Sequence, residues 1–130
     1  NKINSIVKWN VFAKKVKTHK KEVLKFFKKN KSKKIIGFGS SARSQTFLNY
    51  LNLNTQNILA IIDNNKLKQN LYSPGTNIPI VDIDYGLNMN PDYVLILAWN
   101  FSKEIIKQCK IKGFKGKFIQ VFPNKLKISK

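Results

Sequence analysis

The residues with the clearest capacity for chemistry lie at positions 34–44, where a short apolar run enters a glycine-containing bend and a helical segment follows. Gly37, Gly39 and Ala42 form the pattern G-x-G-x-x-A. Glycine lets the backbone turn sharply and approach a diphosphate closely, and the first turn of a helix offers unpaired N–H groups and the positive end of its dipole. Three hydroxyls could add hydrogen-bond donors: those of Ser40, Ser41 and Ser44. The segment therefore predicts a phosphate site at the bend.

Two further residues support this prediction. Arg43, at the start of the helical segment, is the only arginine among the 25 lysines and arginines, and its planar guanidinium can bind a phosphate through two parallel hydrogen bonds. Asp63 ends a second apolar run a little over twenty residues past the glycines. In dinucleotide-binding folds an acid at that place accepts hydrogen bonds from ribose hydroxyls. Asp63 could instead cap a turn with the two asparagines that follow it.

The composition narrows the possible catalytic chemistry. Cys109 is the only cysteine, His19 is the only histidine, and six carboxylates are scattered along the chain. No disulfide framework, cysteine metal site, catalytic triad or glycosidase-like acid pair is predicted from this set. We expect Cys109 to be a buried structural thiol, because it falls four residues after Ile105 on a helical stripe. We expect His19 to lie among lysines on a helix surface.

The net charge of +19 is of the kind seen in nucleic-acid-binding proteins. Here the lysines are spread along the chain, aromatic residues do not alternate with them on a strand face, and a compositional bias explains the charge equally well. A basic nucleic-acid module is therefore the lesser interpretation. No stretch is apolar and long enough to span a bilayer, and the start lacks the layout of a signal peptide. We expect a cytoplasmic protein with no membrane partner.

From about residue 3 to residue 30, apolar residues recur at three- and four-residue steps, which predicts one long amphipathic helix. Its apolar face would carry Ile6, Trp9, Ala13, Val16, Val23 and Phe27. The helix is longer than a small sheet needs for cover, and the chain begins with Asn1 instead of methionine. We therefore expect residues 1–30 to connect to an upstream domain, and residues 31–130 to form the folded domain. Alternatively, the helix could simply overhang the core.

The rest of the chain alternates short apolar runs with helical segments, the pattern of a doubly wound parallel α/β sheet. Helices are expected after the bend and at about 102–112, ending at Gly113. About five strands are expected: the run before the bend, then 57–62, 78–81, 93–98 and 117–122. Pro79 restricts the third strand to an edge, and the continuous apolar run of the fourth suits a central position. The simplest strand order is three, two, one, four, five.

In this order the winding reverses between strands one and four, and ligands bind at such a point. We therefore expect the glycine bend, Asp63 and Trp99-Asn100 to face one crevice, with the loop from Tyr72 to Thr76 above it. Trp99 could stack on a base or sugar, or it could be a core residue at a strand end. Asn100 could bind a ligand amide, although a role as cap of the following helix is the simpler expectation.

Taken in order, five sequence blocks resemble the C-terminal domain of S-adenosylmethionine-dependent sugar C-methyltransferases over roughly residues 23–122. The blocks are Gly37-x-Gly39-x-Ser41-Ala42-Arg43, Thr46-x-Leu48-Asn49-Tyr50, Asp63-x-Asn65-x-x-Lys68, Pro74-Gly75-Thr76-x-Ile78-Pro79-Ile80, and Pro91-Asp92-Tyr93-Val94-Leu95 with Ala98-Trp99-Asn100. Members of this family join a zinc-binding N-terminal domain, a central methyltransferase domain and a Rossmann-like C-terminal domain. They methylate a carbon of a nucleotide-linked keto-deoxysugar.

The resemblance implies that this domain helps to bind a nucleotide sugar of dTDP type beside an upstream methyltransferase domain of the same chain. Arg43, with Lys66 or Lys68, would neutralise the diphosphate. S-adenosylmethionine, zinc and the catalytic residues would lie on the other domains, so no catalytic or metal-binding residue is expected here. Departures from the family pattern leave the sugar, the methylated carbon and the activity of the parent open: Asn77 in place of histidine, and Asn65 and Asn70 in place of proline and glycine.

The same residues also fit a free-standing binding or regulatory module for an NAD-type dinucleotide, because the glycine bend and Asp63 suit an adenine dinucleotide as well as a thymidine sugar. Both interpretations share one set of candidate ligand-binding residues. These are Gly37, Gly39, Ser40, Ser41, Ala42, Arg43, Ser44, Asp63, Lys66, Lys68, Tyr72, Thr76, Trp99 and Asn100.

Overall fold

The computed structural model describes residues 2–121 and 126–130, and within these ranges the side chains of residue 14 and of residues 17 onward. The strands are β1 (Ile35–Phe38), β2 (Ile61–Ile62), β3 (Ile80–Val81), β4 (Tyr93–Ile96), β5 (Lys117–Gln120) and β6 (Lys127–Ser129). The helices are α1 (Lys2–Lys29), α2 (Ala42–Tyr50), α3 (Ile83–Leu87), the 3-10 turn η1 (Trp99–Phe101) and α4 (Ser102–Ile111).

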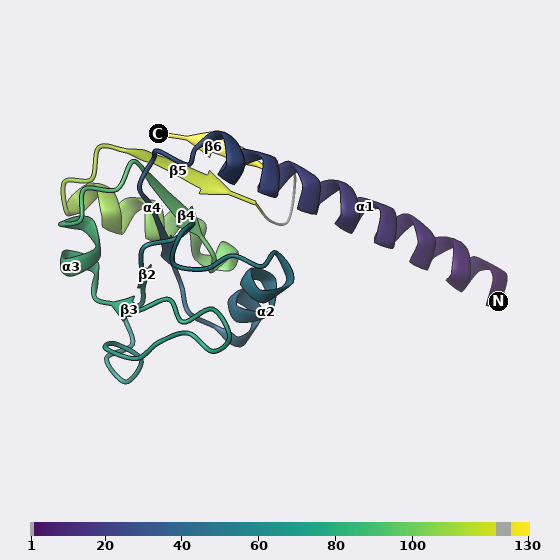
Figure 1. The fold of residues 1–130 in the computed structure, drawn as a ribbon, viewed down its shortest axis with the longest axis horizontal. Coiled ribbons are helices and arrows are strands. Elements are labelled where there is room, and N and C mark those ends of the chain that lie inside the picture. The colour runs from purple at the N-terminus through teal and green to yellow at the C-terminus, as the bar shows by residue number, and fades with distance from the viewer. Residues whose placement is uncertain (1, 122–125) are drawn as a thin grey trace.

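Within the described residues, the strands form one sheet in the order β3-β2-β1-β4-β5-β6, with helices on both faces (Figure 1). Strands β1 to β5 pair in parallel, and β6 pairs antiparallel with β5. The doubly wound α/β fold and the predicted order of the first five strands are confirmed. The antiparallel edge strand β6 and the short helix α3 were not predicted.

Successive residues of the strands point to opposite faces of the sheet, as extended backbone requires. Ile35 points into an apolar cluster beneath α1 and α2, and its neighbour Ile36 points into a second cluster beneath α3 and α4. Both residues are almost completely buried. Because both faces are covered, the central strands need apolar residues at nearly every position, which explains their continuous apolar runs.

The C-terminal part of α1 anchors this helix to the sheet. Val23 is fully buried, and Phe26 packs edge-to-face on Tyr93 of β4 with 5.3 Å between ring centroids. Phe27 is buried in the same cluster. The first half of α1 extends past the sheet in Figure 1. The long helix is therefore confirmed, whereas part of the predicted stripe lies outside the described side chains: Ile6, Trp9, Ala13 and Val16.

The predicted strands are longer than the observed ones, because paired backbone covers only part of each apolar run. β2 forms at 61–62 within the predicted 57–62, and β5 ends at Gln120. Residue 122, the predicted end of that strand, lies outside the described residues. β3 lies at the edge of the sheet, and Pro79 precedes it in an isolated bridge to Tyr72. The edge position that proline required is therefore confirmed.

Asparagine builds several left-handed turns of this chain. Every described non-glycine residue with a positive φ is an asparagine: Asn52, Asn70, Asn77 and Asn90. Asparagine adopts this conformation at less cost than other residues that carry a β-carbon. Asn70, with φ at 70°, can therefore fill a position where the family pattern has glycine without changing the backbone.

Candidate functional site

A hollow of about 340 Å³ lies at the carboxyl ends of β1 and β4, the two strands between which the winding of the sheet reverses. One wall is the start of α2, and the other is the segment that follows β4. The lining residues are Ser41, Ala42, Arg43, Leu97, Ala98, Trp99, Asn100 and Phe101. A hollow thus lies at the predicted position, and its lining includes five of the predicted site residues: Ser41, Ala42, Arg43, Trp99 and Asn100.

Arg43 and Trp99 form a cation–aromatic pair in this hollow. The Cζ atom of Arg43 lies 5.9 Å from the centroid of the Trp99 ring. Arg43 is exposed and Trp99 is half-buried. A guanidinium held against an indole ring keeps its N–H edge available for an anion, while the aromatic surface suits a base or a sugar. The hollow therefore combines a cation with a flat apolar surface.

The two glycines of the bend make close contacts with the segment after β4. Gly39 has φ at +107°, and a β-carbon at this position would lie 2.6 Å from the Cβ of Ala98. A β-carbon on Gly37 would lie 2.8 Å from Cδ1 of Leu97. Packing against the segment after β4 therefore requires glycine at position 39 and favours it at position 37, whether or not a ligand approaches. Neither glycine lines the hollow.

The carboxylate of Asp63 accepts a backbone N–H of the bend, and this bend was predicted to bind phosphate. The Ser40 N–H donates to Oδ2 of Asp63, and the Asn65 N–H donates to Oδ1, both at 2.8 Å. Asp63 thus caps the turn that follows it, which was the alternative to a ribose contact. An anion at the Ser40 N–H would meet a carboxylate of the same charge. The bend itself therefore does not offer the predicted diphosphate cradle at this group.

The hydroxyls predicted as phosphate donors are used mainly inside the protein. Ser41 and Ser44 form a capping box, in which the Ser44 N–H donates to Ser41 Oγ at 3.1 Å and the Ser41 N–H donates to Ser44 Oγ at 2.7 Å. Ser44 is fully buried, and the buried Ser40 hydroxyl accepts a hydrogen bond from Gln45. Of the three serines, only Ser41 lines the hollow. Within the described residues, the N–H groups of Ala42 and Arg43 make no hydrogen bond.

The two lysines expected beside Arg43 lie outside the hollow. The Nζ of Lys68 donates to the carbonyl oxygen of Ser40, and Lys66 is exposed on the same loop. Arg43 is the only cation among the residues that line the hollow within the described part of the chain. Any anion bound there would therefore be neutralised by Arg43 and not by these lysines.

The loop from Tyr72 to Thr76 also lies outside the hollow. Thr76 is buried and its hydroxyl bonds to that of Ser73, while Tyr72 is exposed. The loop reaches α2 through Asn49, whose Nδ2 donates to the carbonyl oxygen of Pro74 at 3.2 Å. Gly75 in this loop has a positive φ of +81°, which glycine adopts without strain.

The segment after β4 differs from the prediction in two ways. Asn100 does not cap α4, because the chain enters this helix through η1 with Phe101 at the N-cap and without a side-chain cap hydrogen bond. Sequence reasoning also missed three lining residues: Leu97, Ala98 and Phe101. An apolar run predicts a buried strand but not which of its last residues border a hollow. The exposure of Phe101, at 61 %, had no sequence signal.

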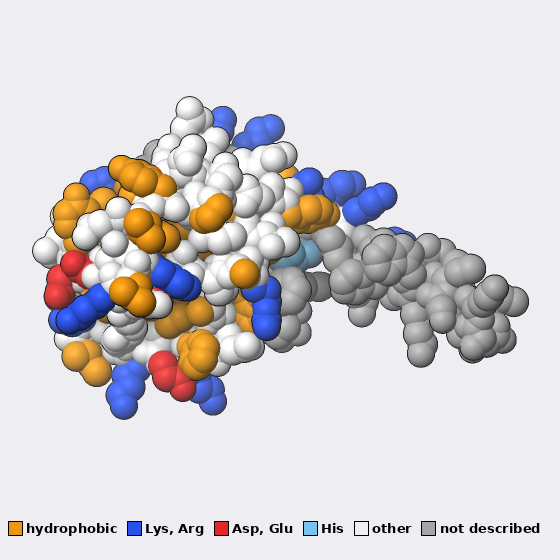
Figure 2. Space-filling view, turned by 90° about the horizontal axis from the view of Figure 1, so that it is seen from below, with side chains coloured by type: hydrophobic (Ala, Val, Ile, Leu, Met, Phe, Trp, Pro, Cys, Tyr) orange, Lys and Arg blue, Asp and Glu red, His pale blue; other side chains and the backbone are white. Residues whose placement is uncertain are grey.

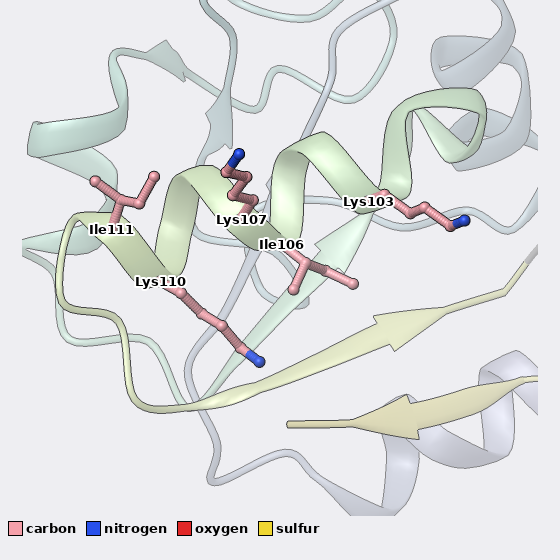
Figure 3. A pocket seen from close by; sticks show the side chains of 5 residues that line it. All are labelled: Lys103, Ile106, Lys107, Lys110 and Ile111. Carbon is pink, nitrogen blue, oxygen red and sulfur yellow. The ribbon is translucent and has the colours of Figure 1, made fainter.

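A second hollow, of about 540 Å³, lies on the outer surface of α4 (Figure 3). It is lined by Lys103, Ile106, Lys107, Lys110 and Ile111. All five side chains come from this one helix, and they point in different directions along it (Figure 3). No second element supplies converging groups, so we interpret this hollow as the solvated face of a surface helix.

The remaining reactive side chains have structural roles. Cys109 is fully buried, as predicted, and burial raises the pKa of its thiol to about 11, so the thiol is protonated at neutral pH. His19 does not simply face solvent among lysines, because its Nε2 hydrogen-bonds the carbonyl oxygen of Val121 and its ring lies near Phe47.

The described residues contain no group of three or more His, Cys, Asp or Glu that could hold a metal ion. Nor does the described part of the chain contain a helix with the length and apolar character needed to cross a membrane.

Two comparisons with known proteins agree with each other. Residues 1–123 match a family model described as the C-methyltransferase C-terminal domain. The chain is also similar to the C-methyltransferase NovU of Streptomyces niveus, with 35% identity over 100 residues. That similarity covers 75% of this chain and 23% of NovU, so the chain spans about a quarter of the length of this relative. The resemblance expected from the five sequence blocks is confirmed.

Proposed function

Because the chain belongs to the family of C-methyltransferase C-terminal domains, we propose that it binds a nucleotide-linked keto-deoxysugar for a methyltransferase that acts on a carbon of this sugar. The nucleotide sugar, of dTDP type, would lie in the hollow between α2 and η1. An upstream methyltransferase domain of the same polypeptide would hold S-adenosylmethionine and carry out the transfer.

The observation that carries this proposal is the Arg43–Trp99 pair in the hollow where the winding reverses. A nucleotide sugar combines a flat base, sugar rings and a diphosphate. Trp99 and Phe101 offer aromatic surface to the base or a sugar, whereas the Arg43 guanidinium and the unpaired N–H groups at the start of α2 offer donors to the diphosphate. The volume of about 340 Å³ lies within the usual range of small-molecule sites.

The lining of the hollow supports a binding role without catalysis. C-methylation requires a general base that removes the proton beside the keto group, so that the carbanion can attack the methyl group of the sulfonium donor. The residues that line the hollow include no carboxylate, histidine or cysteine. Zinc does not fit this chain either, since its single cysteine is buried and protonated. We therefore assign the base, the methyl donor and zinc to other domains.

Calorimetric titration of the chain with dTDP, NAD and S-adenosylmethionine tests this proposal. We expect dTDP to bind and the other two to show no binding at the same concentrations. Binding of NAD alone would replace the proposal with the dinucleotide module. One observation disfavours that alternative: Asp63, its expected ribose ligand, already accepts backbone N–H groups with both carboxylate oxygens.

Substitutions at Arg43 then locate the site. Arg43→Ala should weaken dTDP binding about 10- to 100-fold, because it removes a charge-assisted hydrogen bond to the diphosphate. Arg43→Lys should give an intermediate loss, since it keeps the charge but not the planar pair of donors. Lys103→Ala on α4 removes a cation outside the hollow and should leave the affinity unchanged. Equal effects of Arg43→Ala and Lys103→Ala would show that only the general positive charge attracts the ligand.

A further inference from the structure

The loop of residues 64–72, which follows β2, exposes three large apolar side chains. Leu67 is 85 % exposed, Tyr72 66 % and Leu71 55 %. The loop lies at the lower end of the molecule in Figure 1, and Figure 2 looks onto that end. Hydrophobic side chains and lysines lie next to one another on this face (Figure 2). We call residues 64–72 the Leu67 loop.

Hydrogen bonds fix the backbone of the Leu67 loop in place. The Nε2 of Gln69 donates to the carbonyl oxygen of Asp63 at 2.8 Å. The Asn70 N–H donates to the Ile80 carbonyl oxygen at 2.9 Å, and the Ile80 N–H donates to Leu71 at 2.8 Å. The apolar side chains therefore project from a fixed backbone, and a partner that covers them would pay little to order it. Contiguous exposed apolar side chains are a feature of interaction surfaces, so this loop is a candidate docking surface.

The inference about the partner starts from the position of the loop. Lys68 of the loop bonds to the carbonyl oxygen of Ser40, and the next residue, Ser41, lines the hollow. The loop follows the carboxyl end of β2, and the hollow lies at the carboxyl ends of β1 and β4, so a domain that covers this edge of the sheet would contact both. We propose that the Leu67 loop docks the methyltransferase domain of the same polypeptide, an inference that rests on the proposed function.

Two further observations favour this occupant. The chain covers only 23% of the related C-methyltransferase NovU, so most of that protein lies outside the matched domain. The net charge of this chain is +19, and the exposed Lys66 adjoins Leu67. Two copies of so basic a surface repel each other, whereas an apolar surface with an acidic rim complements it. We therefore expect the partner surface to be apolar with an acidic rim.

Hydroxyl-radical footprinting of the full-length protein tests the inference, because it measures the exposure of each side chain in place. Two residues provide matched controls: Tyr85 is 61 % exposed and Ile111 is 74 % exposed. Ile111 ends α4, about 14 Å along the helix axis from Ser102, which follows Phe101 of the hollow between α2 and η1. We expect Tyr72 to be oxidised at least fivefold more slowly than Tyr85, and Leu67 at least fivefold more slowly than Ile111. Equal rates within each pair would overturn the inference.

A charge substitution identifies what covers the loop. Leu67→Asp should restore oxidation of Tyr72 in the full-length protein, and Ile111→Asp should not. The melting temperature of each variant checks that the domain remains folded. Protection of Tyr72 that disappears on dilution, together with a dimer mass in analytical ultracentrifugation, would assign the surface to a second copy and overturn the inference.

Titration with dTDP separates this inference from the proposed function. Leu67→Asp should leave dTDP affinity unchanged, because the loop does not line the hollow. Loss of dTDP binding in this variant would make the loop part of the ligand site and overturn docking. If Tyr72 is protected in a protein that does not bind dTDP, the docking inference stands and only the proposed ligand is refuted.

Discussion

At the centre of the sheet the chain reverses direction twice: in the turn from β1 into α2, and in the turn from β4 through η1 into α4. These two reversals use their polar groups in opposite ways. After β1, Asp63 accepts the Ser40 N–H, and Ser41 and Ser44 cap the helix that follows. After β4, the chain passes through η1 into α4 without a side-chain cap, and Trp99 lies along the hollow. The glycine-rich reversal, which carries the stronger sequence motif, uses most of its polar groups within the protein, and the plainer reversal supplies most of the residues that line the hollow.

The largest effect is expected from a β-carbon where the two reversals touch. Gly39→Ala should lower the free energy of unfolding by about 2–5 kcal/mol, because the new methyl group overlaps Ala98 and the left-handed backbone becomes strained. Gly113→Ala is the matched control, since Gly113 also has a positive φ but no atom lies within 4 Å of the added carbon. We expect this control to cost about 1–2 kcal/mol in urea unfolding. Similar losses in both variants would show that the contact with Ala98 is unimportant.

The aromatic side of the hollow gives the next largest effect. Trp99→Ala should weaken dTDP binding by about 1–3 kcal/mol, the usual contribution of one aromatic side chain stacked on a base. Trp99→Phe keeps an aromatic ring and should recover part of the affinity, which distinguishes stacking from a loss of structure. Tyr85→Ala, away from the hollow, serves as the control in the same titration. Unchanged dTDP affinity in Trp99→Ala would show that the reversal after β4 does not contribute the aromatic contact that distinguishes it from the reversal after β1.

Substitution of Asp63 tests whether the polar groups of the reversal after β1 are already used by hydrogen bonds within the protein. Asp63→Asn keeps the shape but leaves one amide oxygen for two backbone donors, so the free energy of unfolding should fall by about 1–2 kcal/mol. The dTDP affinity should change by less than about threefold, because Asp63 does not line the hollow. A much tighter complex would mean that the carboxylate had been excluding phosphate from the bend. Asp84→Asn, which removes an exposed pair with Lys112, should cost less than about 1 kcal/mol.

The smallest effect is expected from the helix cap. Ser41→Ala removes the Oγ that accepts the Ser44 N–H and should cost about 1 kcal/mol in thermal unfolding. Thr46→Ala, in the middle of the same helix, removes an exposed hydroxyl and should change stability by less than about 0.5 kcal/mol. Equal melting temperatures for the two variants would show that the capping box contributes little.

The fold could be predicted because its determinants are local. Apolar runs marked the strands, and Pro79 assigned β3 to an edge. The crossover rule then made β1 and β4 neighbours, which brought Arg43 and Trp99 to one hollow. The edge strand β6 escaped prediction, because a three-residue strand among lysines has no clear apolar period.

The details of the site depend on contacts between distant residues. Two uses of Asp63 were open, and the choice depends on the direction of a backbone N–H at Ser40, 23 residues earlier. Lys68 was expected to face the ligand, and a carbonyl oxygen holds it elsewhere. Phe101 lies in a 3-10 turn, whose period differs from that of the helix that follows, so helical spacing could not place its side chain.

The left-handed asparagines also bear on the chemical ageing of the protein. An asparagine loses ammonia and becomes aspartate when the N–H of the next residue attacks its side-chain carbonyl, and a small next residue speeds this reaction. The residues that follow the four left-handed asparagines are Leu53, Leu71, Ile78 and Pro91. Branched side chains hinder the attack, and proline has no N–H to make it. These four turns should therefore resist deamidation during storage, and mass spectrometry of an aged sample should find conversion at other asparagines first.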